Sequence, residues 1–188
     1  LSKFKPVKSD FREKHNLENK TVLLGVAFDW SPRKGIDDFK RLAGELPEEY
    51  AIVLVGVSDA AAKELPGRIV SIACTQSQEE LAEIYSAADL FVNPTLEDNF
   101  PTVNLEALAC GTPVITFPTG GSPEIIDSTC GIVTKEQTVD SVMEAILQMR
   151  QEKERYTETM CCRRAKQFDQ KNCYESYVAL YEDVLKNG

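Results

Sequence analysis

The sequence predicts an α/β fold: a doubly wound, open parallel sheet of about six strands, followed by a segment of helices only. Short apolar runs alternate with helical segments between residues 21 and 134. The runs are almost continuously apolar, which is typical of parallel strands that are buried on both faces. Beyond residue 137 only helical patterns remain. We therefore expect a Rossmann-like sheet with an all-helical C-terminal segment.

Strands are expected wherever apolar residues run together for strand length, as in "TVLLGVA" and "YAIVLVG". They are predicted over residues 21–27, 50–56, 68–73, 89–94, 112–117 and 130–134.

Helices are expected between these strands, over residues 36–46, 58–65, 77–88, 101–110 and 122–127. The first repeats apolar side chains at helical spacing. Ser58 and Ser77 are suited to cap the second and third, and Glu80 completes a capping box with Ser77. Pro101 is suited to the first position of the fourth.

Three further helices are predicted over residues 138–151, 153–168 and 170–186. The apolar residues of the last one, which we expect to form its buried face, are Tyr174, Tyr177, Val178 and Tyr181. The predicted organisation has three parts: a linker with a short helix at 1–18, a Rossmann-like domain at 19–137 and C-terminal helices at 138–188 that pack on the same domain. The first residue is Leu, and we expect the chain to be a fragment of a longer protein.

Composition excludes several classes of protein. The net charge of −9 argues against a general nucleic-acid binder, which needs an excess of cations to neutralise phosphates. No run of 18 apolar residues occurs, so the sequence encodes no membrane span. The six cysteines show no C-x-x-C spacing and the single histidine, His15, is far from them, so neither a zinc site nor any other metal site is expected. We expect free thiols in a reducing cytoplasm.

Two consecutive cations, Arg33 and Lys34, follow the first predicted strand. In an open parallel sheet, ligands bind outside the carboxyl ends of the strands, where this loop lies. Arg can bond two phosphate oxygens at once and Lys acts as a point charge, so the pair could neutralise a diphosphate. The alternative is a solvated loop.

The stretch "TLEDNFPTVNLEALACGTPVI" (95–115) combines a helix start with acidic residues. The segment Asn99, Phe100, Pro101, Thr102 and Val103 places backbone N–H groups at the start of a helix, where an anion is favoured.

Carboxylates flank that helix start. Glu106, in the second turn, could accept hydrogen bonds from a ribose diol, and Asp98 or Glu97 could hold the hydroxyls of a second sugar. A phosphate site between two such carboxylates describes a nucleotide-sugar site. The alternative is that Glu97 and Asp98 only complement the helix dipole and that Glu106 is solvated.

Two glycines, Gly120 and Gly121, precede the predicted short helix at 122–127 and could let the backbone approach a ligand closely. The alternative is a loop that needs a positive φ. Other ligand motifs are missing: the sequence contains no G-x-G-x-x-G, no G-x-x-x-x-G-K-[ST] and no D-x-D.

Taken together, these segments resemble the C-terminal domain of the family-4 retaining glycosyltransferases (glycosyl transferases group 1). These enzymes have the GT-B fold, in which two Rossmann-like domains enclose the active site. The matching segments are "FKPVKSDFREKHNL", "SPRKGIDDF", "EELAEIYSAADLFVNPT" and "NLEALACGTPVI…TGGSPEII". The family usually has two glutamates eight residues apart. Glu106 matches the second; Asp98 stands eight residues before it and Glu97 nine, and the choice between them stays open. Asp29 stands where the family usually has an arginine.

The resemblance implies roles for these residues. Glu106 would bind the nucleotide ribose, and Glu97 or Asp98 the donor sugar. Lys34, Arg33 and the amides near Phe100, Thr102 and Val103 would hold the diphosphate as leaving group, Gly121 would approach the donor, and the loop at Ala73–Thr75, with Thr75, would meet the base.

The implied reaction is transfer of a hexosyl unit from a nucleotide diphosphate sugar, with a UDP-sugar favoured, to an acceptor hydroxyl, with retention and without a metal or other cofactor. The implied setting is cell-surface polysaccharide synthesis in the cytoplasm, at the membrane face. The acceptor-binding N-terminal domain would lie outside this chain, which we expect to be inactive alone; the helix at 170–186 would pack partly against that domain and here leave an apolar patch exposed. The alternatives are one half of a sugar-nucleotide epimerase and a nucleotide-binding scaffold without catalysis.

Overall fold

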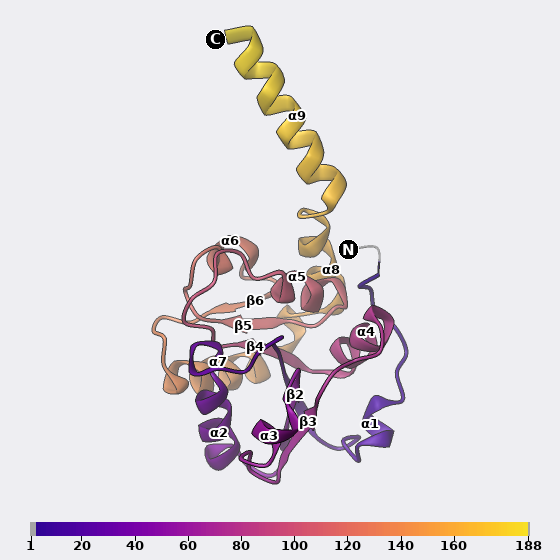
Figure 1. Cartoon of the computed structure of the whole chain (residues 1–188), viewed down its shortest axis with the longest axis vertical. Coiled ribbons are helices and arrows are strands. Elements are labelled where there is room, and N and C mark those ends of the chain that lie inside the picture. Colours follow the sequence, from indigo (N-terminus) through magenta and orange to yellow (C-terminus); the bar gives the residue numbers. More distant parts are fainter. Residues whose placement is uncertain (1–2, 188) are drawn as a thin grey trace.

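A six-stranded parallel sheet forms the centre of the molecule, as the sequence predicts (Figure 1). The computed structural model describes residues 3–187. The strand order is β3-β2-β1-β4-β5-β6. The strands are β1 (Thr21–Val26), β2 (Tyr50–Val55), β3 (Ile69–Ile72), β4 (Leu90–Asn93), β5 (Val114–Thr116) and β6 (Gly131–Val133).

Helices connect the strands and then continue alone. They are α1 (Phe11–Lys14), α2 (Ile36–Glu45), α3 (Asp59–Ala62), α4 (Gln78–Ala87), α5 (Thr102–Ala109), α6 (Ser122–Ile125), α7 (Val139–Gln151), α8 (Glu158–Lys166) and α9 (Gln170–Asn187). Two short 3₁₀ turns are η1 (Pro32–Lys34) and η2 (Lys153–Arg155). The serine caps predicted from sequence are present, since the Ser58 and Ser77 side chains accept hydrogen bonds from the N–H groups of Ala61 and Glu80.

Two predicted helices differ in detail from the structure. The predicted helix over 153–168 is interrupted after η2, and α8 begins again behind Thr157, whose side chain accepts a hydrogen bond from the Met160 N–H. Pro101 does not occupy the first helical position. It is the residue before α5, with φ −72° and ψ 100°, so that Thr102 starts the helix.

Each face of the sheet has its own apolar core, because successive side chains of a strand point to opposite faces. On β1, Val22 and Leu24 pack with α1, α4, α5, α6 and α8. Leu23, between them, packs with α2 and α7 on the other face. This alternation explains why the strands read as continuous apolar runs in the sequence.

The winding direction of the sheet reverses between β1 and β4. β1 pairs in parallel with β2 on one side, and with β4 on the other through Leu23–Leu90 and Leu24–Phe91. The loops after β1 and β4 therefore leave the same edge of the sheet side by side, which is where doubly wound folds bind ligands.

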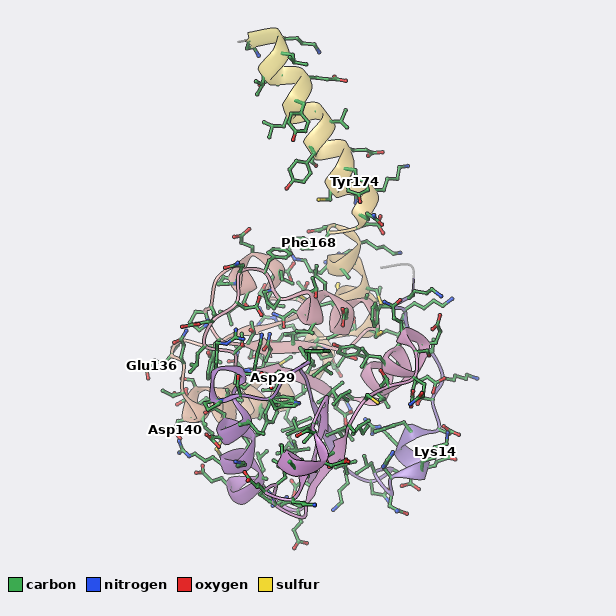
Figure 2. All side chains as sticks on the ribbon, in the orientation of Figure 1. Lys14, Asp29, Glu136, Asp140, Phe168 and Tyr174 are labelled. Carbon is green, nitrogen blue, oxygen red and sulfur yellow. The ribbon has the colours of Figure 1, made fainter. Side chains whose placement is uncertain are left out.

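One expectation about the last helix is wrong. α9 projects away from the body of the protein (Figure 1), and its apolar side chains are exposed, with Tyr174 59% and Tyr181 66% accessible. Figure 2 shows Phe168 where α9 joins the body and Tyr174 beyond it. The face predicted to be buried, formed by Tyr174, Tyr177, Val178 and Tyr181, is thus solvent-exposed, because this chain offers it no partner surface within residues 3–187. In that same part of the chain, no helix combines the length and the apolarity that crossing a membrane requires.

The turn after β2 depends on a glycine. Gly56 has φ +88°, and a Cβ there would lie 1.7 Å from the carbonyl oxygen of Ala27, in the loop after β1. We predict that Gly56→Ala lowers the free energy of unfolding by about 2–4 kcal/mol, because it combines backbone strain with a backbone clash. A Cβ added at Gly44, in α2, would meet no atom within 4 Å, so Gly44→Ala is the matched control and should stabilise by up to about 1 kcal/mol. Urea unfolding measures both; equal stabilities for the two variants would contradict this interpretation.

Candidate functional site

A cavity of about 340 Å³ opens between the loops that follow β1 and β4. Its lining residues are Val26–Trp30, Arg33, Lys34, Val92–Pro94, Asp98 and Phe100–Val103. It lies at the carboxyl ends of two strands on either side of the reversal in winding. This position and the mixture of cations, a carboxylate and a helix start make it the candidate ligand site.

The two cations are held beside this cavity by η1. The Arg33 carbonyl accepts a hydrogen bond from the Leu96 N–H at 2.9 Å, which ties the loop after β1 to the loop after β4. The Arg33 guanidinium donates to the Glu97 carbonyl oxygen at 3.2 Å. The two loops are therefore joined by hydrogen bonds, and the sequence prediction that Arg33 and Lys34 lie at the site is consistent with their position.

Lys34 and Asp98 form an ion pair across the two loops. The Lys34 Nζ lies 2.9 Å from the Asp98 Oδ2, and the side chains are 24% and 23% exposed. The other carboxylate oxygen, Oδ1, accepts a hydrogen bond from the Phe100 N–H at 3.2 Å. Asp98 therefore links the cation of the first loop to the backbone that leads into α5.

The structure separates the two acidic residues that the sequence left as alternatives. Asp98 lines the cavity, whereas Glu97 is exposed and contributes only its carbonyl oxygen to the Arg33 contact. Of the two, Asp98 is thus the one positioned to face a ligand.

The amino end of α5 forms another part of the cavity wall. Pro101, Thr102 and Val103 line the cavity there. The first turn of an α-helix has N–H groups without intrahelical acceptors and carries partial positive charge. Cations and a helix amino end thus face the same space, an arrangement that favours a bound anion.

Glu106 lies one turn further along α5 and does not line the 340 Å³ cavity. It shares a helix face with Thr102, because residues four apart project to the same side. Its Oε2 accepts a hydrogen bond from the hydroxyl of Tyr85, in α4, at 3.1 Å. Burial raises the pKa of Glu106 above its ordinary value of 4.5, and the Tyr85 hydrogen bond opposes this shift. Burial, with the nearby Glu106 carboxylate, also raises the pKa of Tyr85 well above 10.0.

Three other predicted residues are not brought into the cavity. Gly121 is buried behind Phe100: its N–H donates to the Asn99 carbonyl oxygen at 2.7 Å, and a Cβ there would lie 2.5 Å from the Phe100 ring. Asn99 is exposed on the loop before α5. Thr75 follows β3, which is separated from β1 by β2. For Gly121, close packing between two loops explains the glycine without a ligand.

Several lining residues were given no binding role from the sequence. Trp30 donates from Nε1 to the Val55 carbonyl oxygen at 2.8 Å, and Asp29, labelled in Figure 2, lies beside it on the loop after β1. Asn93 closes the end of β4 and donates from Nδ2 to the Asn104 Oδ1 at 2.9 Å. The sequence signal for Asn93 was a polar residue at the carboxyl end of an otherwise apolar strand.

A larger cavity, of about 530 Å³, lies at the other edge of the sheet. Its lining includes the residues where strands begin, such as Thr21, Tyr50 and Leu90, together with Arg150 and Lys153. Size alone would favour this larger cavity as the ligand site. The smaller cavity is preferred because parallel α/β sheets bind ligands at the carboxyl ends of their strands.

Comparison with known proteins identifies a family to which the chain is similar. The family described as "Glycosyl transferases group 1" matches residues 7–167. A relative, the N,N'-diacetylbacillosaminyl-diphospho-undecaprenol alpha-1,3-N-acetylgalactosaminyltransferase of Campylobacter jejuni, is 28% identical over 202 residues, which cover 100% of this chain and 53% of the relative.

Solved structures show the same fold. Sucrose-phosphate synthase from Thermosynechococcus elongatus superposes with a TM-score of 0.78 at 26% identity, over 100% of this chain and 51% of that one. Anabaena Alr3699/HepE in complex with UDP superposes with a TM-score of 0.81 at 19% identity, over 97% and 55%. The chain thus spans about half the length of the proteins that it resembles.

The environment of Glu106 generates a pH-dependent prediction. Because its pKa is raised in the folded state, the stabilisation from its neutral form is complete below 4.5 and is lost as the pH rises through the folded pKa. We predict that Glu106→Gln, which is neutral at every pH, is more stable than the wild type at about pH 7, and that this advantage shrinks toward about pH 4.

Urea unfolding at both pH values measures the difference. Glu97→Gln, at an exposed position, is the matched control and should change stability little. A Glu106→Gln protein that is less stable than the wild type at neutral pH would contradict the buried, pKa-shifted carboxylate.

Proposed function

The chain belongs to the glycosyl transferases group 1 family, and from this premise we propose that it is the donor-binding domain of a retaining, metal-independent glycosyltransferase. The enzyme transfers a hexosyl unit from a nucleotide diphosphate sugar to an acceptor hydroxyl. The observation that carries the proposal is the cavity that Arg33 and Lys34 line together with the amino end of α5.

In this proposal the diphosphate occupies that cavity. Lys34 exchanges part of its contact with Asp98 for a phosphate oxygen, and Arg33 adds a second cation at the rim. The N–H groups around Phe100, Thr102 and Val103 approach the same anion. Because charge accumulates on the diphosphate when it leaves, the same groups stabilise the transition state.

The remaining parts of the donor are assigned by position along α5 and the strand ends. Glu106, on the same face as Thr102, accepts hydrogen bonds from the ribose hydroxyls. Asp98 contacts hydroxyls of the transferred sugar, and the loop with Thr75 lies beside the base. Anabaena HepE was solved with UDP and with UDP-glucose, which supports a UDP-sugar as the donor.

The chemical step breaks one bond and forms another at the same face of the sugar. The bond from the anomeric carbon to the phosphate oxygen breaks, and its electron pair goes to the diphosphate. The acceptor oxygen then bonds to the anomeric carbon on that same face, and its proton passes to the departing phosphate oxygen, so that the configuration is retained.

The acceptor site belongs to a separate N-terminal domain of the longer enzyme, so this chain alone is inactive. The name of the Campylobacter jejuni relative describes transfer onto a diphospho-undecaprenol-linked sugar. By analogy, we place this enzyme in cell-surface polysaccharide synthesis in the cytoplasm, peripheral to the membrane.

Titrations with UDP and with pyrophosphate distinguish contacts to the diphosphate from contacts to the nucleoside. We predict that Lys34→Ala lowers the affinity for both UDP and inorganic pyrophosphate about tenfold or more, because it removes a charge-assisted contact to phosphate. Glu106→Ala lowers the affinity for UDP but leaves the affinity for pyrophosphate unchanged, since pyrophosphate has no ribose. Isothermal calorimetry with UDP, GDP, ADP and pyrophosphate measures these affinities at millimolar ligand.

Lys153→Ala is the matched control, because this cation lines the cavity at the opposite edge of the sheet. Its affinities should equal those of the wild type. If the wild type binds no nucleotide at millimolar concentration, the donor-binding proposal fails and the scaffold alternative is favoured. If Lys153→Ala weakens binding and Lys34→Ala does not, the ligand is at the other cavity.

The exposed helix α9 is proposed to pack on that N-terminal domain, which would cover its apolar side chains. We predict that deleting residues 174–188 changes the melting temperature by less than about 3 °C, because these side chains make few contacts with the body. Thermal unfolding followed by circular dichroism measures this. A drop of about 10 °C or more would show that α9 belongs to the core of this domain.

A further inference from the structure

Two buried amide side chains lie directly beneath the candidate site. Asn93, at the end of β4, is 7% exposed and lines the 340 Å³ cavity. Asn104, in the first turn of α5, is 0% exposed. The Asn93 Nδ2 donates to the Asn104 Oδ1 at 2.9 Å, so the pair joins the end of a central strand to the start of the helix.

One group of this pair is unsatisfied. Within residues 3–187, the Asn104 Nδ2 has no hydrogen-bond partner although it is buried. The residue that follows it in α5, Leu105, is apolar and buried. A buried donor without an acceptor costs free energy and is rare in native proteins. An apolar pair at these positions would avoid that cost, which indicates that the amides serve something other than stability.

The pair has a second orientation with the same packing. Turning both amides by about 180° exchanges their oxygen and nitrogen atoms without moving the side chains. Asn104 Nδ2 then donates to Asn93 Oδ1, and both N–H groups of the Asn93 Nδ2 become available to another acceptor. The atom left unpaired is now the side-chain oxygen of Asn104, Oδ1. An unsatisfied C=O group is tolerated better than an unsatisfied N–H group.

An anion in the cavity distinguishes between the two orientations. In the first, one of the two N–H groups of the Asn93 Nδ2 donates to Asn104, and the other end of the amide is the Oδ1, which would repel an anion beside it. In the second, the Asn93 nitrogen can donate to it. The rest of the cavity wall, with Arg33, Lys34 and the amino end of α5, already favours negative charge.

We propose that Asn93 is a diphosphate-contacting residue, that Asn104 is its positioning residue, and that a bound anion holds the pair in the second orientation. This inference rests on the proposed function, because it takes the diphosphate to be the anion in this cavity. The contact is to phosphate rather than to sugar hydroxyls, so it should be visible with pyrophosphate alone.

The test uses the full chain and two probes, inorganic pyrophosphate and UDP, in calorimetric and NMR titrations. The variants are Asn93→Leu, Asn104→Leu and the double leucine variant. Leucine matches asparagine in shape, so the double variant replaces both polar groups and should be at least as stable as the wild type in urea unfolding. We expect Asn93→Leu and the double variant to bind both probes about tenfold more weakly and Asn104→Leu about three- to tenfold more weakly.

Thr116→Val is the matched control. The Thr116 hydroxyl is buried and donates to the Asn93 carbonyl oxygen at 3.2 Å, so its loss disturbs the same strand end without touching the amide pair. This variant should be less stable but bind both probes as the wild type does. In the wild type, pyrophosphate should shift the side-chain amide resonances of Asn93 and Asn104, and Asn104→Leu should reduce the shift of Asn93.

The outcomes are separable. If the wild type binds both probes and the double variant binds them equally well, the amide pair is structural and the inference is overturned while the proposed function stands. If the wild type binds pyrophosphate but not UDP, the nucleotide-sugar proposal fails, and weaker pyrophosphate binding by Asn93→Leu still supports the contact. If the wild type binds neither probe, both proposals are overturned.

Discussion

The pairing of β1 with β4 is the constraint on which the rest of the site depends. Residues 27–89 lie between these strands in the chain, yet Leu23 and Leu24 pair directly with Leu90 and Phe91. The winding of the sheet therefore reverses there, and two loops leave the same edge as neighbours. Without this pairing, the cations after β1 and the helix start after β4 would lie too far apart to act on one ligand.

The two loops are then fixed to one another by a few polar contacts. The Leu96 N–H to Arg33 hydrogen bond joins their backbones, and the Lys34–Asp98 ion pair joins their side chains. The ion pair is about three-quarters buried, so its charges are only partly screened by water. An anion entering the cavity thus meets a lysine that is already oriented, and Asp98 remains close enough to contact whatever is attached to that anion. Pre-oriented charges of this kind lose little freedom on binding.

Much of this arrangement follows from the sequence, for reasons that are local. The six apolar runs predicted the six strands, because a strand buried on both faces needs an apolar residue at every position. The serines before α3 and α4 predicted their caps, because a side-chain oxygen at that position satisfies an otherwise unpaired N–H. The order of strands and cations placed Arg33 and Lys34 at the carboxyl edge.

The features that sequence reasoning missed depend on contacts between distant segments. Whether Glu97 or Asp98 faces the cavity is decided by Lys34 and the Phe100 N–H, and spacing does not contain that information. Gly121 was predicted to approach a ligand, but the structure packs it against Phe100. The apolar face of α9 has the pattern of a buried helix, yet nothing in the pattern says which surface covers it. The amide pair Asn93–Asn104 joins residues 11 apart in two elements, and only the fold shows that they meet.

The most direct test of the account is the position of a bound nucleotide. Two-dimensional NMR of the ¹⁵N-labelled chain, titrated with UDP, reports which backbone amides sense the ligand. The account predicts the largest shifts at Lys34, Phe100, Thr102 and Val103, around the cavity at the carboxyl edge of the sheet. Shifts concentrated at Arg150 and Lys153, around the cavity at the opposite edge, would contradict it.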